Sequence, residues 1–222
     1  MKYSIIPAVM VVASFAAVAS ADVVAGFTFN NLPNSSLPLP TLYAADVGTG
    51  TCTTNFVDGD IIMFAGSTVG GLPGDVSGRG AAFRVGDDAH NNGSYAQFAF
   101  DATGYGDLAL TFATKTTAGT GFTSMDIQVS GNGTDFTTVQ TLTNLRDDAN
   151  WLVKSIDLSG INMLENNADA AIRIVFFGGD AANPTANTRV ENFIIQGSVV
   201  PTPGSVALLG LGGLAATRRR RA

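Results

Sequence analysis

The acidic side chains are the first residues whose type and spacing suggest chemistry. Sixteen of the 18 carboxylates are Asp, and several stand close together, as Asp87 and Asp88 do. Carboxylate and loop carbonyl oxygens are the ligands of Ca²⁺, which takes roughly six to eight of them at about 2.4 Å. A structural calcium held by Asp87 and Asp88 is therefore one expectation. Because Asp also favours turns and helix caps, ordinary turn chemistry is the alternative.

Nucleophilic catalysis has few residues to draw on. His90 is the only histidine, Cys52 is the only cysteine, and the sequence has no Gly-x-Ser-x-Gly elbow. Glu occurs only at positions 165 and 191, and Glu191 is expected to form a surface pair with Arg189. The carboxylate pair that a glycosidase needs is therefore not indicated. These observations predict a chain with no catalytic residues, which is not an enzyme.

Two aromatic residues are candidates for stacking against a sugar ring. Tyr105 lies in the turn-forming run Thr103-Gly104-Tyr105-Gly106, and Trp151 is the only tryptophan. Aromatic faces pack well against apolar surfaces, which include the C–H faces of pyranoses. The alternative is core packing, because a tryptophan in a β-sandwich is usually buried.

The charge distribution narrows the choice of partner. Residues 22–199 hold all 18 acidic residues and only seven basic ones, which gives this body a net charge of −11. Outside Arg218–Arg221 the sequence shows no run of Lys or Arg. Nucleic-acid binding is therefore not expected. An acidic surface is compatible with solubility and with cation binding.

Alternation of apolar and polar residues predicts the elements that must position these side chains. Val23–Phe29 forms a first strand, and residues 30–56, rich in Pro, Gly and Thr, are expected to be irregular. The clearest further strands are expected at Tyr95–Asp101, Asp107–Thr114, Phe122–Val129, Phe136–Leu142, Trp151–Asp157, Ala170–Phe177 and Val190–Gln196.

Turn signals rich in Gly, Asn and Asp separate these segments, and helical signal in the body is weak. Short alternating strands with frequent turns are typical of an antiparallel sandwich. The sequence therefore predicts an all-β fold with eight to ten strands. The architecture we expect is a two-sheet antiparallel β-sandwich of the jelly-roll type.

The N-terminal segment, residues 1–21, has the features of a secretory signal peptide. Lys2 gives the positive start, residues 5–19 are mostly apolar, and Ala19-Ser20-Ala21 has the small-x-small form that signal peptidase cleaves. We expect a signal helix here, followed by a mature chain that begins at Asp22. The apolar run is short for a permanent membrane anchor, which is the alternative.

The C-terminal segment, residues 200–222, has three parts. Pro201-Thr202-Pro203-Gly204 is an extended hinge, residues 206–216 form an apolar stretch, and a block of four arginines follows, Arg218, Arg219, Arg220 and Arg221. As a short hydrophobic helix the apolar stretch would be about 16 Å long, roughly half a bilayer core. The arginine block would stay on the cytoplasmic side during export.

This order of hinge, apolar stretch and arginine block resembles the PEP-CTERM sorting signal, a tail also known as the ice-binding protein C-terminal domain. Thr202 stands where that family has Glu. The resemblance implies recognition and cleavage by an exosortase-type membrane protease after a transient inner-membrane association. It concerns sorting, and it implies neither ice binding nor any other activity of the body.

The body has a resemblance of its own. Its motifs include Tyr95-Ala-Gln-Phe-Ala-Phe, Ser130-Gly-Asn-Gly-Thr-Asp-Phe and Arg189-Val-Glu-Asn-Phe-Ile-Ile. This layout is similar to that of galactose-binding-like and carbohydrate-binding jelly rolls of exported bacterial proteins. The resemblance is one of fold, and it implies binding more than chemistry.

Together these features predict three segments: a signal peptide (1–21), a β-sandwich (22–199) and a sorting segment (200–222). The expected function is that of an exported, non-enzymatic protein of the cell envelope or extracellular matrix, handled by signal peptidase and an exosortase. The alternative is a carbohydrate-binding module for surface exopolysaccharide. Calcium is the one cofactor that the residues suggest.

Overall fold

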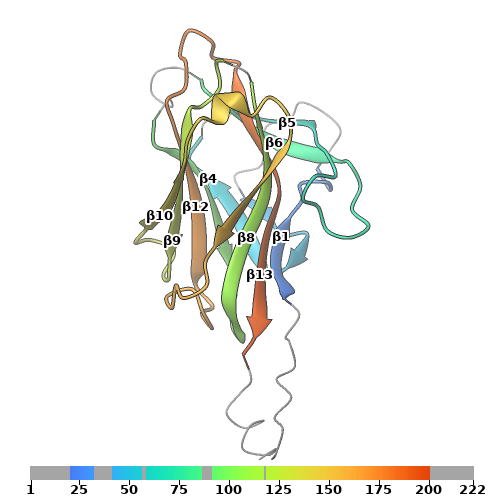
Figure 1. Ribbon diagram of the computed structural model, residues 1–222, viewed down its shortest axis with the longest axis vertical. Helices are drawn as coiled ribbons and strands as arrows, with labels where there is room; N and C mark the ends of the chain where they lie inside the picture. Colours follow the sequence, from blue (N-terminus) through green and yellow to red (C-terminus); the bar gives the residue numbers. More distant parts are fainter. Residues whose placement is uncertain (1–20, 33–41, 57–58, 87–91, 118, 201–222) are drawn as a thin grey trace, which may run out of the picture.

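The chain folds into an all-β sandwich of two antiparallel sheets, the jelly-roll architecture expected from the sequence (Figure 1). The computed structural model describes residues 21–32, 42–56, 59–86, 92–117 and 119–200. Both predicted terminal helices lie outside these residues. Thirteen strands are present in the described part, which is more than the eight to ten that alternation indicates.

The first sheet, here called sheet A, has seven strands in the order β11-β8-β13-β1-β3, with β6 also on β13 and β5 on β6. Every pairing in it is antiparallel. Its strands are β1 (Asp22–Phe27), β3 (Val47–Gly48), β5 (Ile61–Ala65), β6 (Arg79–Arg84), β8 (Tyr105–Thr116), β11 (Leu152–Asp157) and β13 (Asn187–Val199).

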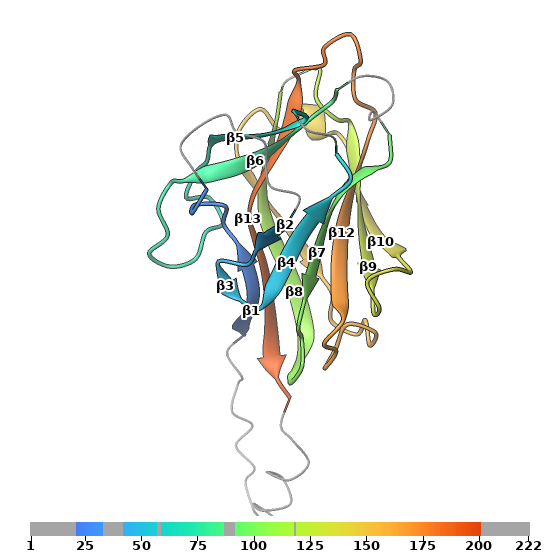
Figure 2. The same cartoon turned by 180° about the vertical axis from the view of Figure 1, so that it is seen from behind.

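The second sheet, here called sheet B, has six strands in the order β10-β9-β12-β7-β4-β2 (Figure 2). A 3₁₀ turn, η2 (Leu145–Asp147), lies between β10 and β11, which are each an edge strand of their sheet. The strands of sheet B are β2 (Leu42–Ala44), β4 (Gly50–Thr54), β7 (Ser94–Phe100), β9 (Ser124–Ser130), β10 (Thr137–Leu142) and β12 (Ala170–Phe177).

Aromatic side chains hold the two sheets together. Phe193 of β13 stacks on Phe98 of β7 with 3.7 Å between ring centroids and 9° between ring planes, which joins sheet A to sheet B. A second aromatic group lies elsewhere in the core and has centroid separations from 4.9 to 6.3 Å. Its members are Phe56, Phe83, Phe122 and Phe176. This burial of large rings is the main source of stability that such a sandwich has.

Residues 30–56, expected to be irregular, contain three of the strands. The pairing of β4 with β7 sets Cys52 opposite Phe98 and Thr51 opposite Ala99. Only Cys52 of β4 is buried, so the strand gives almost no apolar signal. Its place in the sheet comes from backbone pairing with a strand more than 40 residues later, which a local pattern cannot reveal.

Asp46 organises the turn that leads into β3. Its Oδ2 accepts hydrogen bonds from the backbone N–H groups of Thr28 (2.7 Å) and Phe29 (3.1 Å). Its Oδ1 accepts from Tyr43 Oη (2.6 Å) and Asn31 Nδ2 (2.7 Å). Burial, together with the Asp46 carboxylate, raises the pKa of Tyr43, so the phenol keeps its proton and remains a donor. One carboxylate thus ties the end of β1 to the start of β3.

β13 changes partner along its length. Residues Asn187–Val190 pair with β6, while Phe193–Gly197 pair with β1, and the ladder with β8 is interrupted between Glu191 and Ile194. Asn192, inside this interruption, has a left-handed backbone (φ 50°). Asp22 lies opposite Gly197, so β1 and β13 run side by side, and β1 begins at the same end of the sandwich at which β13 ends (Figure 1).

Candidate functional site

A line of polar side chains crosses the outer face of sheet B. The register places one residue from each of five neighbouring strands at the same level, because the alternate residues of these strands point into the core. None of the five is buried. We call this set the polar row, and its members are Thr53 (β4), Gln97 (β7), Arg173 (β12), Gln128 (β9) and Thr138 (β10).

Arg173 occupies the middle of the polar row between two aromatic rings. Its guanidinium carbon lies 3.9 Å from the Tyr95 ring centroid and 3.7 Å from the Phe136 ring centroid. Its Nη2 donates to Gln97 Oε1 (2.8 Å), whereas its buried Nε has no hydrogen-bond partner among the described residues. Burial lowers the pKa of Arg173 and the nearby Tyr95 raises it. An arginine remains charged at physiological pH, so a fixed cation with spare donors stands at the centre of this face.

The loop between β9 and β10 borders the polar row and is held in place by its own hydrogen bonds. Asn132 Oδ1 accepts from the backbone N–H groups of Thr134 (3.0 Å) and Asp135 (2.9 Å), and Asn132 Nδ2 donates to Asp135 Oδ2 (2.7 Å). Gln97 Nε2 donates to the carbonyl oxygen of Gly133 (3.2 Å). The rim of the face is therefore ordered before any ligand arrives, which lowers the entropic cost of binding.

A shallow depression of about 250 Å³ lies beside the polar row. Its lining includes the small side chains of Thr51 and Ala99, which the pairing of β4 with β7 sets opposite each other. Asp101, on the rim, is exposed, and hydrogen bonds from Thr103 lower the pKa of its carboxyl. The depression therefore offers hydroxyl groups and an ionised carboxylate on the same face of sheet B as the polar row.

The groups on this face are hydrogen-bonding side chains and aromatic rings. Amide, hydroxyl and guanidinium groups alternate across an open surface between two aromatic rings. Within the described ranges, no three His, Cys, Asp or Glu side chains are grouped so as to hold a metal ion. Cys52 is fully buried and burial raises the pKa of its thiol to about 12, so it holds no nucleophilic thiolate at neutral pH.

Glu191 does not form the surface pair with Arg189 that the sequence suggested. Its side chain is only 1% exposed, because the loop of residues 66–78 folds over sheet A and covers it. Glu191 Oε1 accepts from both the backbone N–H (2.7 Å) and the hydroxyl (2.6 Å) of Ser67. Alternation places Glu191 and Arg189 on the same face of β13, but it cannot show that a distant loop closes over one of them.

The covered position changes the acidity of Glu191. Burial raises the pKa of its carboxyl to about 7, Asp75 adds to the increase, and the hydrogen bonds from Ser67 and the charge of Arg189 oppose it. Asn192 Nδ2 donates to the carbonyl oxygen of Val69 (2.9 Å) and helps to hold the same loop down. Glu191 is therefore a carboxyl that titrates near neutrality inside the fold, where a substrate has no access to it.

The two predicted stacking residues do not lie on the same site. Tyr105 begins β8, is half-buried and packs against the core. Trp151 immediately precedes β11, whose Leu152 lies opposite Thr114 near the other end of β8. About nine residues of strand separate the two levels, which corresponds to roughly 30 Å. Neither residue belongs to sheet B, and the stacking role of each remains a prediction.

Most of the other sequence-predicted site residues lie outside the described residues. These are Asp87 and Asp88 of the expected calcium site, His90, Ala19, Pro201–Gly204 and Arg218–Arg221. Ala21 is described, is exposed and directly precedes β1. Within the described residues, no helix is both long enough and apolar enough to cross a membrane.

Sequence reasoning missed the polar row. A signal was available, since Gln97 and Arg173 occupy outward positions of strands that were correctly predicted. An arginine in a central strand of uncharged neighbours is unusual enough to mark a face. The contact of Tyr95 with Arg173 depends on the pairing of β7 with β12, and that of Phe136 depends on the path of the loop between β9 and β10. Alternation gives neither.

No family model and no curated protein matches the sequence. Similar solved structures include a cleaved adhesin domain of Lys-gingipain from Porphyromonas gingivalis (12% identity, TM-score 0.45, covering 79% of this chain and 98% of that chain). The CBM22-1 xylan-binding domain from Paenibacillus barcinonensis Xyn10C is 10% identical (TM-score 0.43, 83% and 100% covered). A family 29 carbohydrate-binding module from Piromyces equi is also 10% identical (TM-score 0.42, 82% and 93% covered). Similarity this distant carries no argument about function, so the function is inferred from the residues themselves.

Proposed function

We propose that this chain is an exported, non-enzymatic module that binds polysaccharide of the cell envelope or extracellular matrix through the outer face of sheet B. The observation that carries the proposal is the polar row, with Arg173 held between Tyr95 and Phe136. A sugar presents hydroxyl groups around its edge and C–H groups on its faces. The polar row supplies donors and acceptors for the former, and the flanking rings supply apolar surface for the latter.

The shape of the face favours a chain over a single sugar. Five strands separated by about 4.8 Å make the polar row roughly 19 Å long, which spans several sugar rings. The adjoining depression is open and shallow, with Thr51 and Ala99 in its floor. Small-molecule sites, by contrast, enclose most of their ligand. A polymer gains affinity here from several weak contacts made at once.

The absence of catalysis in the proposal rests on the positions of the carboxylates. Glu191 is buried beneath the loop of residues 66–78, and its oxygens accept hydrogen bonds from Ser67. Asp75, whose charge acts on Glu191, belongs to that loop. Glycosidases need both carboxyl groups open to the scissile bond. Asp101 and Asp135 border the binding face as hydrogen-bonding groups, not as an acid and base pair.

The proposed route to the envelope rests on the two ends of the sequence. Signal peptidase would cut after Ala21, and an exosortase-type protease would act near Pro201-Thr202-Pro203-Gly204 while the apolar stretch and Arg218–Arg221 hold the chain briefly in the inner membrane. Intact masses of the protein from membrane, envelope and medium fractions test this. We expect a species from Asp22 to about Pro203 outside the inner membrane. A single species retaining Arg218–Arg221 in that membrane would show that the tail is a lasting anchor.

Binding is tested with the full chain on a panel of neutral and acidic soluble polysaccharides, by affinity electrophoresis and calorimetry. We expect Arg173→Ala and Gln97→Ala to weaken binding at least tenfold. The control is Ser155→Ala, an exposed position on β11 of the other sheet, which should bind as the unchanged protein does. Equal binding by all three variants would move the site away from sheet B. Binding to none of the polysaccharides would overturn the function itself.

A further inference from the structure

Two cations stand side by side on the outer face of sheet A, on the opposite side of the sandwich from the polar row. Lys115 of β8 lies opposite Arg189 of β13 in the register of the sheet. Together with Thr116, Thr117 and Ala149, they line a depression of about 250 Å³. The depression is therefore bounded by two positive side chains and by threonine side chains.

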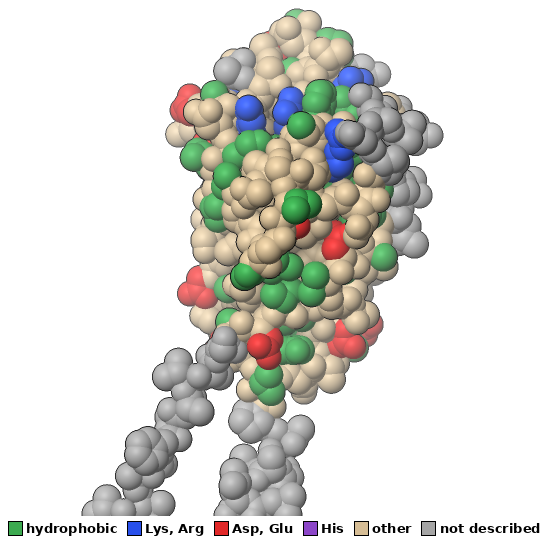
Figure 3. Space-filling model, turned by 90° about the vertical axis from the view of Figure 1, so that its right-hand side faces the viewer, with side chains coloured by type: hydrophobic (Ala, Val, Ile, Leu, Met, Phe, Trp, Pro, Cys, Tyr) green, Lys and Arg blue, Asp and Glu red, His purple; other side chains and the backbone are tan. Residues whose placement is uncertain are grey.

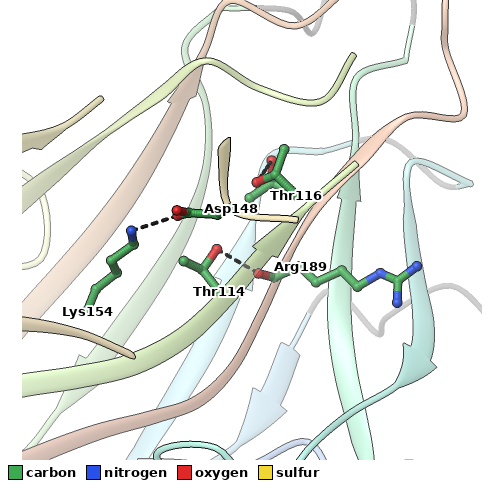
Figure 4. A network of polar contacts seen from close by, with 6 residues as sticks. Thr114, Thr116, Asp148, Lys154 and Arg189 are labelled. Atoms are coloured by element: carbon green, nitrogen blue, oxygen red, sulfur yellow. Dashed lines mark hydrogen bonds and ion pairs between the residues drawn. The ribbon is translucent and has the colours of Figure 1, made fainter. Parts of the chain in front are cut away.

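Neither cation forms an ion pair with an acidic residue of the described part of the chain. The one ion pair there joins Lys154 Nζ to Asp148 Oδ2 (2.6 Å), and Figure 4 shows the Arg189 side chain pointing away from it. The charge of Glu191 acts on Arg189, but the Glu191 carboxylate already accepts hydrogen bonds from Ser67. In a body with a net charge of −11, two cations facing the same depression form a local reversal of charge.

Arg189 is held ready for a ligand. Its guanidinium carbon lies 4.1 Å above the centroid of the Phe64 ring, and its Nε donates to Asn187 Oδ1 (3.2 Å). Thr114 Oγ1 donates to the backbone carbonyl oxygen of Arg189 (2.9 Å), as Figure 4 shows. The Phe64 ring therefore covers one face of the Arg189 guanidinium, and the Asn187 side-chain amide holds its Nε. The two Nη groups make no hydrogen bond within the described residues, and they form the fork that binds an oxyanion in a bidentate manner.

Trp151 adds an apolar surface near these cations. It directly precedes Leu152, which lies opposite Thr114, and this places Trp151 at the level of Lys115. Its half-buried ring reaches across the sheet, since a Cβ atom on Gly80 would lie 3.1 Å from Trp151 Cη2. Figure 3, viewed from the side of β5 and β6, shows Lys and Arg side chains gathered in the upper part of the face and most of the acidic ones lower down.

We propose that Lys115 and Arg189 form a second binding site, on sheet A, for the carboxylate or sulfate group of an acidic polysaccharide, with Trp151 beside the sugar that bears it. The acidic remainder of the body repels a dense polyanion such as nucleic acid. A glycan whose anionic groups are spaced by uncharged sugars places one of them in the depression and keeps the others away. The site shares its ligand class with the proposed function but none of its residues, so either can fail alone.

The test is calorimetric titration of the full chain with three soluble polymers of similar length: hyaluronan, in which every second sugar carries a carboxylate, κ-carrageenan, in which every second sugar carries a sulfate, and neutral dextran. We expect binding to hyaluronan, to κ-carrageenan or to both, with affinity falling steeply as NaCl rises, and none to dextran at this site. Comparison of the two acidic polymers identifies whether carboxylate or sulfate is preferred. Failure of both to bind at low salt would overturn the proposal.

Variants distinguish binding at the Lys115 and Arg189 site from an effect of net charge alone. Lys115→Gln and Arg189→Gln should each weaken binding of the preferred acidic polymer at least fivefold. Arg79→Gln is the matched control, since it removes one positive charge from the same sheet but lines no part of the depression. An equal loss in Arg79→Gln would mean that net charge alone is responsible. Lys115 is only partly buried and makes no ion pair within the described residues, so Lys115→Gln keeps the test valid if Arg189→Gln does not fold.

Arg173→Ala distinguishes the two faces. It should leave binding of the acidic polymer at Lys115 and Arg189 within twofold of the unchanged protein, while it removes binding on sheet B. If Arg173→Ala abolishes acidic-polymer binding and Lys115→Gln does not, the anion is bound at the polar row. The second site would then be wrong while the proposed function stands.

Discussion

Glu191 Oε1 accepts hydrogen bonds from both the backbone amide and the hydroxyl of Ser67, a residue 124 positions earlier in the chain. The contact fixes the loop of residues 66–78 on sheet A at the point where β13 changes its partner from β6 to β1. It also removes a carboxyl group from water, so the stability of this region depends on the protonation of one side chain.

Stability should fall as the pH rises through the titration range of Glu191. Its pKa in the fold is about 7, above its ordinary value of 4.5, so between these values the folded chain holds more protons than the unfolded one. The stabilising contribution is complete below about pH 4.5 and is lost by about pH 7.5. Because each pKa unit corresponds to about 1.4 kcal/mol, a loss of roughly 2 kcal/mol is expected after allowance for screening.

Urea unfolding at pH 5, 6, 7 and 8 measures this effect, with Glu191→Gln as the reference that cannot titrate. The difference in unfolding free energy between the unchanged chain and Glu191→Gln should shrink or reverse as the pH rises. A difference that stays constant across this range would mean that Glu191 is already ionised in the fold at pH 5.

Replacing Arg173 by Lys should cost both stability and binding although the charge is kept. An ammonium group cannot stack flat between Tyr95 and Phe136, and each cation–π contact is worth about 0.5–1 kcal/mol. We expect Arg173→Lys to lower the unfolding free energy by about 1 kcal/mol and to weaken polysaccharide binding severalfold. Unfolding and binding curves that superimpose on those of the unchanged chain would show that charge alone matters at this position.

Asp46→Asn should destabilise the turn before β3. The carboxylate accepts hydrogen bonds from Thr28, Phe29, Asn31 and Tyr43, and an amide would direct N–H groups towards some of these donors. Loss of charged hydrogen bonds at a partly buried site costs about 3 kcal/mol. Chemical unfolding checks this value, with the exposed Asp169→Asn as control, where a change below about 0.5 kcal/mol is expected.

Phe193→Ala should be among the most damaging substitutions in the body. Phe193 is fully buried and contacts Phe27, Phe98 and Phe112, which come from both sheets. Removing such a ring leaves a cavity and costs about 3–5 kcal/mol, whereas Phe193→Leu refills part of the space and should cost about half as much. Thermal and urea unfolding measure the loss of unfolding free energy in each variant. Equal and small losses would mean that the core is more loosely packed than the structure shows.

The thiol of Cys52 should be inert in the folded chain. Burial raises its pKa to about 12, and the side chain is fully enclosed between the sheets. Ellman's reagent at pH 8 should find almost no reactive thiol in native buffer and one per chain in denaturant. Rapid labelling without denaturant would reveal local opening of β4 that the packed structure does not indicate.

The sequence predicted those parts of the fold that carry a local pattern. Strands β7, β8 and β9 were found because inward apolar residues alternate with outward ones along most of their length. β2, β3 and β4 were missed because they are short and bury few side chains. Their positions follow from hydrogen bonding to distant strands.

The candidate sites were less accessible to sequence reasoning for a related reason. Arg173 and Gln97 lie 76 positions apart and meet only through the pairing of β12 with β7. Lys115 and Arg189 meet through the pairing of β8 with β13. The sequence shows that the body is acidic, but it does not show that two cations lie together on sheet A. The register of the sheets decides which side chains become neighbours.

The pairing of β1 with β13 also sets how the body responds to mechanical load. Because Asp22 lies opposite Gly197, a pull that separates these two ends peels the ladder open one residue pair after another. A force applied at Val199 while sheet B is held fixed acts differently. It runs along β13, which is hydrogen-bonded on both sides, and loads those ladders in shear, so many bonds share the tension. β13 therefore separates from β1 at a lower force than is needed to pull it lengthwise out of sheet A.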